Sequence, residues 1–160
     1  MRITSGFECV VACPLSRLGY YEPDQPENGD NQRLEVSVVF TDATGTLAAL
    51  EMAERLAKRL EARLRLLMPY EVPYTLPLSK PAVPVEFLEG QIRTLASRVP
   101  MEIAANIYLC RDKQRTLRLI LKTGSLVIMG GRKGWWPTPA QRLAGTLERD
   151  GHHVIFTELR

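Results

Sequence analysis

Cysteines and long apolar runs are scarce in this sequence. Its 3 cysteines, Cys9, Cys13 and Cys110, form no CxxC pair and have no histidine at ligand spacing. This pattern predicts reduced thiols in a cytoplasmic protein and no metal site. No apolar run approaches the roughly 20 residues of a membrane-spanning helix, and FECVVACPL contains Glu8. Neither a membrane segment nor a signal peptide is therefore expected.

A surplus of one charge is also missing. The formal net charge is only +3, and in EMAERLAKRLEARLR the basic residues alternate with glutamates. Glu51 can pair with Arg55, and Glu54 with Lys58, which is typical of a solvated helix face and not of a nucleic-acid-binding stripe. We expect no nucleic-acid partner and no membrane partner.

Familiar catalytic motifs are absent as well. The sequence has no G-x-S-x-G elbow, no H-E-x-x-H helix and no complete Walker loop. The adjacent His152 and His153 have no carboxylate or nucleophile placed beside them, so we assign them to the entry of a strand. The sequence predicts a binding or regulatory module and not an enzyme.

What is present is a polar N-terminal region followed by short apolar runs that alternate with amphipathic segments. Residues 1–33, with YYEPDQPENGDNQ, predict an arm or linker. Residues 34–160 predict one domain, which is long enough to bury a core. Its predicted strands are EVSVVF, LRLLM, EIAANIYL, SLVIM and HVIFTEL.

Four helices are predicted between these strands. The first covers about 46–61, and the second begins near Val85 and is stopped by Pro100. In the third, Asp112 is placed to cap the N-terminus and Gly124 the C-terminus. The last helix has a capping box formed by Thr138 and Gln141, with Pro139 between them.

The alternation of strands and helices predicts a three-layer, doubly wound α/β fold with a five-stranded parallel sheet and helices on both faces. In such a sheet the ligand crevice lies beyond the carboxyl ends of the strands, where the winding reverses. We therefore expect ligand contacts from residues 41–45 and 130–137.

Two segments at this separation resemble the universal stress protein family. VVFTDATGTLAALEMAERLAKRLEARLRLL is similar to the family's first strand, helix and second strand, and TGSLVIMGGRKG to its fourth strand and the following turn. The likeness covers residues 34–160 in element order. It implies a strand order of 3-2-1-4-5, a homodimer, and either ATP binding or a stress role without a nucleotide.

The ATP-binding members of that family carry G-x2-G-x9-G-[ST], in which small residues let backbone N–H groups approach the phosphates. Counted from Gly130, the second glycine position holds Lys133, with Gly134 one residue late, and the last pair holds Leu143 and Ala144. The resemblance therefore implies a degenerate ATP-binding motif.

Other positions of the family's site also depart from the pattern. Gly145 and Thr146 supply the terminal pair only after a shift, and they lie inside the predicted last helix. The acidic residue at the end of the family's first strand corresponds to Thr41 or, with a slip, to Asp42. We interpret Asp42 first as a cap of the first helix and only second as a ligand contact. ATP stays an open cofactor, but binding through the standard loop is not expected.

An anion can bind near the last helix without the glycine motif. The helix N-terminus at Thr138 has free N–H groups and a partial positive charge, and Arg132 and Lys133 precede it. Gly130 and Gly131 either contact the ligand or form a tight turn with positive φ. The candidate nucleotide- or anion-binding residues are Thr41, Asp42, Gly130, Gly131, Arg132, Lys133, Gly134 and Thr138.

Trp135 and Trp136 are adjacent on the loop before the last helix. Two neighbouring tryptophans cannot both bury in a tight turn, so we expect at least one to be partly exposed. They form a candidate interaction loop that stacks on a base or anchors a protein partner. Alternatively, the two rings fold over the helix ends as a hydrophobic lid.

In the strand order that the resemblance implies, HVIFTEL is an edge strand with no proline or inward lysine to blunt it. It predicts a homodimer formed through Val154, Ile155, Phe156 and Thr157.

The first functional hypothesis is a non-catalytic, homodimeric regulatory protein of the universal stress protein type that does not use the standard ATP loop. The alternative is an adenine-nucleotide-binding stress protein with slow ATPase or sensing activity through a remodelled loop. A response-regulator receiver has a similar element order but needs an Asp at the end of the third strand, where IYLC stands.

Overall fold

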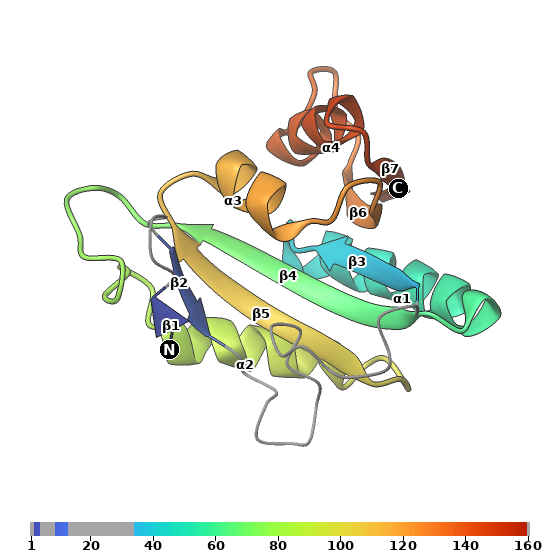
Figure 1. Ribbon diagram of the computed structural model, residues 1–160, viewed down its shortest axis with the longest axis horizontal. Coiled ribbons are helices and arrows are strands. Elements are labelled where there is room, and N and C mark those ends of the chain that lie inside the picture. The colour runs from blue at the N-terminus through green and yellow to red at the C-terminus, as the bar shows by residue number, and fades with distance from the viewer. Residues whose placement is uncertain (1, 4–8, 13–33, 160) are drawn as a thin grey trace.

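The structure is a computed structural model that describes residues 2–3, 9–12 and 34–159. Its centre is a seven-stranded sheet in the order β1-β2-β5-β4-β3-β6-β7 (Figure 1). The parallel strands are β3 (Glu35–Val39), β4 (Arg63–Glu71), β5 (Ile103–Cys110), β6 (Leu126–Arg132) and β7 (His153–Leu159). Numbered along the domain, they have the predicted order 3-2-1-4-5. The predicted parallel α/β sheet is confirmed.

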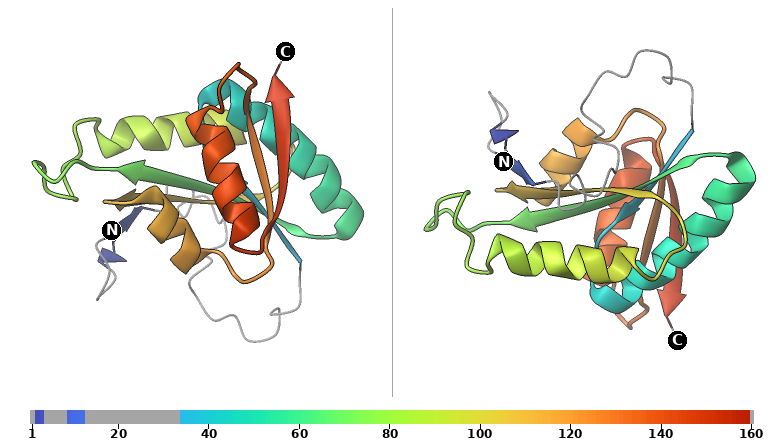
Figure 2. Two further views of the ribbon diagram at one scale, coloured as in Figure 1. Left: turned by 90° about the horizontal axis from the view of Figure 1, so that it is seen from above. Right: turned by 90° about the horizontal axis from the view of Figure 1, so that it is seen from below.

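Four helices of the described residues cover the two faces of the sheet, which confirms the three-layer arrangement. They are α1 (Ala43–Leu60), α2 (Val85–Ala96), α3 (Lys113–Ile120) and α4 (Pro139–Arg149). Helices α1 and α2 lie on one face, and α3 and α4 on the other (Figure 2). Leu50 and Ile92 belong to the core under the first pair, and Leu117 and Leu147 to the core under the second.

Helix α1 begins at Ala43, earlier than the apolar spacing predicted, because Asp42 caps it. Asp42 Oδ1 accepts a hydrogen bond from Gly45 N at 2.7 Å. This bond satisfies one of the N–H groups that the first turn of a helix leaves unpaired. The capping role predicted for Asp42 is confirmed.

Strand β4 continues to Glu71, beyond the predicted segment, although it contains Pro69. Arg63 N donates to Leu34 O at 2.8 Å, so the odd-numbered residues of β4 direct their N–H groups toward β3. Pro69 has the same phase, but β3 pairs with β4 only as far as Val39. The proline therefore has no ladder hydrogen bond to lose.

Strand β6 also runs further than predicted, because it includes Gly130, Gly131 and Arg132. Its pairing with β7 continues to Arg132 opposite Leu159, which keeps both glycines extended. Neither glycine has a positive φ, so the interpretation as a tight turn is wrong. Gly124 does have a positive φ, of 72°, but α3 ends before it and Leu121 is its C-cap.

Two predicted helix starts are confirmed. Asp112 caps α3 by accepting a hydrogen bond from Arg115 N at 3.0 Å. In α4, Thr138 and Gln141 form the expected capping box, with Pro139 at the first helical position. These caps place both helix N-termini at the carboxyl edge of the sheet.

Two further strands, β1 (Arg2–Ile3) and β2 (Cys9–Ala12), lie in the region predicted as an arm. Strand β2 pairs antiparallel with β5, and β1 pairs with β2. They extend the sheet on the β5 side, while β7 forms the opposite edge. The division of the chain near residue 33 stays a prediction. Within the described ranges, every helix is too short or too polar to cross a bilayer.

Candidate functional site

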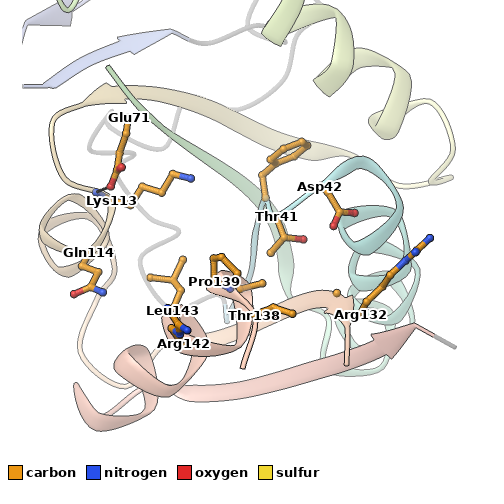
Figure 3. Close-up of a pocket in the computed structure, with 13 residues that line it drawn as sticks. Thr41, Asp42, Glu71, Lys113, Gln114, Arg132, Thr138, Pro139, Arg142 and Leu143 are labelled. Carbon is orange, nitrogen blue, oxygen red and sulfur yellow. Dashed lines mark hydrogen bonds between the residues drawn. The ribbon is translucent and has the colours of Figure 1, made fainter. Parts of the chain in front are cut away.

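A crevice of about 560 Å³ opens at the carboxyl edge of the sheet, between the ends of β3 and β6 (Figure 3). These two neighbouring strands mark the point where the winding direction reverses, as predicted. The volume suits a small organic ligand. The lining residues are Phe40, Thr41, Asp42, Glu71, Lys113, Gln114, Gly131, Arg132, Thr138, Pro139, Ala140, Arg142 and Leu143.

The floor of the crevice is held by Thr41. Its hydroxyl donates to Gly130 O at 2.6 Å, and its backbone N–H donates to Thr46 Oγ1 at 3.0 Å. The ends of β3 and β6 and the first turn of α1 are thus joined through one residue. This network holds the two strand ends and the helix start together beside the crevice.

Gly130 and Gly45 bring the backbones of β6 and α1 into direct contact. A Cβ atom on Gly130 would lie 2.0 Å from Gly45 O, and one on Gly45 would lie 2.4 Å from Gly130 O. No larger side chain fits at either position. Gly130 is therefore explained by the packing of α1 on the sheet, without a phosphate contact. It does not line the crevice.

Three cationic side chains, Lys113, Arg132 and Arg142, come to the crevice from three elements. In Figure 3 the Lys113 amine points into the space between Glu71 and the β3 end, whereas Arg132 extends outward past Asp42. None of the three cations is ion-paired within the described part of the chain. The three cations outnumber the two carboxylates of the lining, Asp42 and Glu71.

The two carboxylates of the lining already accept hydrogen bonds from helix N-termini. Asp42 Oδ1 accepts from Gly45 N at 2.7 Å, and Glu71 Oε1 accepts from Lys113 N at 3.0 Å. Each one stabilises the positive end of a helix. Their charge is directed in part to α1 and α3, which leaves the cations to dominate the open side.

The N-terminus of α4 offers less to an anion than we predicted, because its capping box uses its donors. Thr138 N donates to Gln141 Oε1 at 2.8 Å, and Gln141 N donates to Thr138 Oγ1 at 3.2 Å. Pro139 has no N–H. The N–H of Ala140 is the donor that remains in this turn.

The structure brings together five of the predicted binding residues and separates three. Those that line the crevice are Thr41, Asp42, Gly131, Arg132 and Thr138. Gly130 packs behind it, Lys133 pairs with Glu158 at 3.5 Å on the surface, and Gly134 lies in the loop beyond.

Sequence reasoning missed Glu71, Lys113, Gln114 and Arg142. Glu71 is the last residue of β4, and Lys113 is the first of α3. The rule that ligands meet the carboxyl ends of strands would have found Glu71 if the end of β4 had been placed correctly. Lys113 follows β5, a strand that was not expected to reach the crevice. Arg142 faces the crevice because of the direction of α4, which no local pattern reveals.

Residues 133–137 form the tryptophan loop, which connects β6 to α4. Relative to an isolated residue, Trp135 is 102% exposed and Trp136 is 82% exposed. The predicted exposure is confirmed, and the alternative of a lid over the helix ends is wrong. Both loop anchors, Arg132 and Thr138, line the crevice.

The remaining polar candidates lie away from the crevice. His152 is buried, and its Nδ1 accepts a hydrogen bond from Ser125 N at 3.2 Å, while His153 N donates to Ser125 O. The assignment of both histidines to a strand entry is confirmed. Burial raises the pKa of the Cys110 thiol, which therefore stays protonated near neutral pH. No cluster of three metal-ligating side chains occurs among the described residues.

Comparison with known proteins identifies the fold. No protein-family model and no curated protein matches the chain. Among solved structures, it is similar to the crystal structure of a universal stress protein in complex with cAMP. The TM-score is 0.50 at 14% identity, and the match covers 80% of this chain and 98% of that chain. The chain thus has an α/β fold like that of a universal stress protein.

Proposed function

We propose that this protein is a non-catalytic regulatory protein of the universal stress protein type, whose crevice binds an adenine nucleotide with a single phosphate. The observation that carries the proposal is the cationic lining at the switch point of the sheet. Lys113 and Arg142 approach the crevice from α3 and α4, and neither is ion-paired with another described residue. A phosphate bound between α3 and α4 would accept charged hydrogen bonds from both of these side chains.

A single phosphate fits better than a triphosphate, because a backbone cradle is missing. The backbone of α1 fills the space beside Gly130, and a Cβ on Gly131 would lie 3.2 Å from the Phe156 ring. The Gly145-Thr146 pair lies inside α4, where the Thr146 hydroxyl donates to Arg142 O. The similar universal stress protein was solved with cAMP, which also carries one phosphate.

A titration by calorimetry tests this function. We expect AMP or cAMP to bind with a dissociation constant below about 1 mM, or about −4 kcal/mol, and Mg-ATP to bind more weakly without phosphate release. Low micromolar binding of Mg-ATP would instead favour the alternative, a nucleotide-dependent protein with a remodelled loop.

Two charge variants and a matched control locate the ligand. Lys113→Ala and Arg142→Ala should each weaken AMP binding about tenfold or more, since each removes a charged hydrogen-bond donor. Lys122→Ala removes an exposed lysine outside the crevice and should leave the affinity unchanged. Equal affinities in all three variants would place the nucleotide elsewhere.

We further propose a homodimer formed through β7. His153 N donates to the carbonyl oxygen of Ser125, the residue just before β6. The odd-numbered residues of β7 therefore direct their N–H groups toward β6. By alternation, Val154, Phe156 and Glu158 direct theirs toward the open edge. Pairing with the same strand of a second copy satisfies these groups on both chains.

The alternation gives a matched pair of proline variants. Glu158→Pro removes an outward N–H at an exposed side chain and should yield a folded monomer by light scattering. Thr157→Pro removes an inward N–H that bonds to β6 and should lower the thermal stability instead. A wild-type protein that stays monomeric at high micromolar concentration would contradict the dimer.

A further inference from the structure

The tryptophan loop (residues 133–137) leaves a large aromatic surface in water for which the fold of the chain gives no reason. Trp135 and Trp136 are 102% and 82% exposed, whereas soluble proteins normally bury most of a tryptophan. Neither side chain is part of the hydrophobic core. Such a pair is typical of a surface that meets a planar or apolar partner.

The loop is attached to the crevice at both ends. Arg132, just before it, and Thr138, just after it, are lining residues. The strand end is fixed by the contact of Gly130 with Gly45, and the helix end is fixed by the capping box. Trp135 and Trp136 therefore lie on a short segment that begins and ends at residues of the crevice lining.

Two exposed tryptophans suit either a membrane surface or a ligand with a flat ring, and the positions of the nearby cations distinguish the two. A membrane surface calls for a cluster of several free cations beside the aromatic residues. Here Lys133 is paired with Glu158 at 3.5 Å, and Arg132 is the remaining cation of that segment. The other two cations of the crevice, Lys113 and Arg142, lie across it on α3 and α4.

This distribution suits a ligand with a phosphate at one end and a flat ring at the other. We infer that the tryptophan loop and the crevice form one composite site, in which Trp135 or Trp136 stacks on the base of a bound nucleotide while Lys113 and Arg142 hold its phosphate. The inference rests on the proposed function. It adds that the loop at the degenerate glycine motif recognises the base and not the phosphates.

Fluorescence excited selectively at tryptophan reports on this loop alone, because Trp135 and Trp136 are the 2 tryptophans of the chain. Addition of AMP should quench the fluorescence of the full-length protein, whereas ribose 5-phosphate, which lacks a base, should leave it nearly unchanged. By calorimetry, AMP should bind about 5- to 100-fold more tightly than ribose 5-phosphate, the range expected for stacking of one base on an aromatic side chain.

The double variant Trp135→Ala/Trp136→Ala should remove this difference. It should bind AMP as weakly as ribose 5-phosphate, and the affinity for ribose 5-phosphate should match that of the wild type. Trp135→Phe/Trp136→Phe should restore most of the difference, since a phenyl ring still stacks. Phe87→Ala is the matched control, because Phe87 is an exposed aromatic residue on α2, outside the crevice, and its removal should change neither affinity.

The outcomes separate the two proposals. If AMP binds and the double variant retains the full preference for AMP, base stacking is wrong and the phosphate site stands. If neither AMP nor ribose 5-phosphate binds, both are wrong. A fluorescence blue shift with vesicles of phosphatidylserine and phosphatidylcholine, without a response to AMP, would overturn stacking in favour of a membrane surface.

Discussion

Two loops at the carboxyl edge of the sheet are built in opposite ways. The loop between β4 and α2, residues 72–84, is tied down by Arg111. Its Nη1 donates to the carbonyl oxygens of Val72, Pro73 and Leu76 at 3.0, 2.6 and 2.9 Å, and its guanidinium stacks on Tyr74 at 4.9 Å. The tryptophan loop is fixed only at its ends, and its aromatic side chains face water.

The difference separates two uses of a loop in this fold. The long, proline-rich 72–84 loop follows the end of β4, and three of its carbonyl groups accept hydrogen bonds from Arg111. The tryptophan loop exposes its apolar surface to water, and its two anchors line the crevice. Substitutions in the first should therefore affect stability, and substitutions in the second should affect binding.

The largest effect is expected at Gly130 and Gly45, where α1 contacts the part of β6 that leads into the tryptophan loop. Gly130→Ala or Gly45→Ala would place a methyl group within 2.4 Å of a backbone oxygen and push α1 from β6. We expect a loss of about 3 kcal/mol or more in the free energy of unfolding, measured by urea denaturation.

Gly145→Ala is the matched control for this prediction. Gly145 lies inside α4, and a Cβ there meets nothing within 4 Å. The change should stabilise the protein by about 0.5–1 kcal/mol, because alanine favours a helix. A Gly130→Ala protein as stable as the wild type would show that the contact between α1 and β6 is looser than described.

Releasing the 72–84 loop should have the next largest effect. Arg111→Ala removes three hydrogen bonds to carbonyl groups and the contact with Tyr74. We expect a loss of about 2 kcal/mol in stability and faster hydrogen exchange across residues 72–84. If exchange there stays as slow as in the wild type, the prolines alone hold the loop and the comparison fails.

A smaller effect is expected at the far anchor of the tryptophan loop. Thr138→Ala removes the hydroxyl that accepts from Gln141 N and should cost about 1 kcal/mol in stability. The matched variant Thr138→Ser keeps a hydroxyl that can accept this hydrogen bond and should leave the stability nearly unchanged. Only Thr138→Ala should also weaken AMP binding; equal AMP affinities of the two variants would show that the anchor does not matter.

The smallest effect on stability is expected from the tryptophans themselves. Replacing both by alanine should change the free energy of unfolding by less than about 0.5 kcal/mol, because neither side chain is buried. Circular dichroism during thermal unfolding measures this. A large loss of stability would mean that the rings pack against the protein in solution and that the contrast between the two loops is wrong.

Local patterns predicted most of the fold and part of the site. Apolar periodicity located the strands and helices, and the caps at Asp112 and Thr138 marked two helix starts. The end of β4 was missed because Pro69 reads as a strand breaker. Its missing N–H has no consequence only because β3 has already ended, and that depends on the register of two strands.

The crevice shows the same limit. Thr41 and Arg132 follow the strand ends that the sequence predicts, and they were assigned to the site from that position. Gly130 was misread because its role depends on α1, and the Thr41–Gly130 hydrogen bond joins residues 89 apart in sequence. Arg142 was missed because the direction of α4 across the sheet decides where its side chain lies. Contacts between distant elements are not encoded in any short motif.

Amide chemical shifts of ¹⁵N-labelled protein, recorded during a titration with AMP, test the central claim most directly. Our account predicts that the perturbed amides cluster around Thr41, Lys113, Gly131 and Ala140, with further changes in the tryptophan loop. A second hollow, lined by Ala43, Phe87, Gly90 and Thr94 between α1 and α2, should stay unaffected. Perturbations confined to that hollow, or none at millimolar AMP, would contradict the proposed nucleotide site.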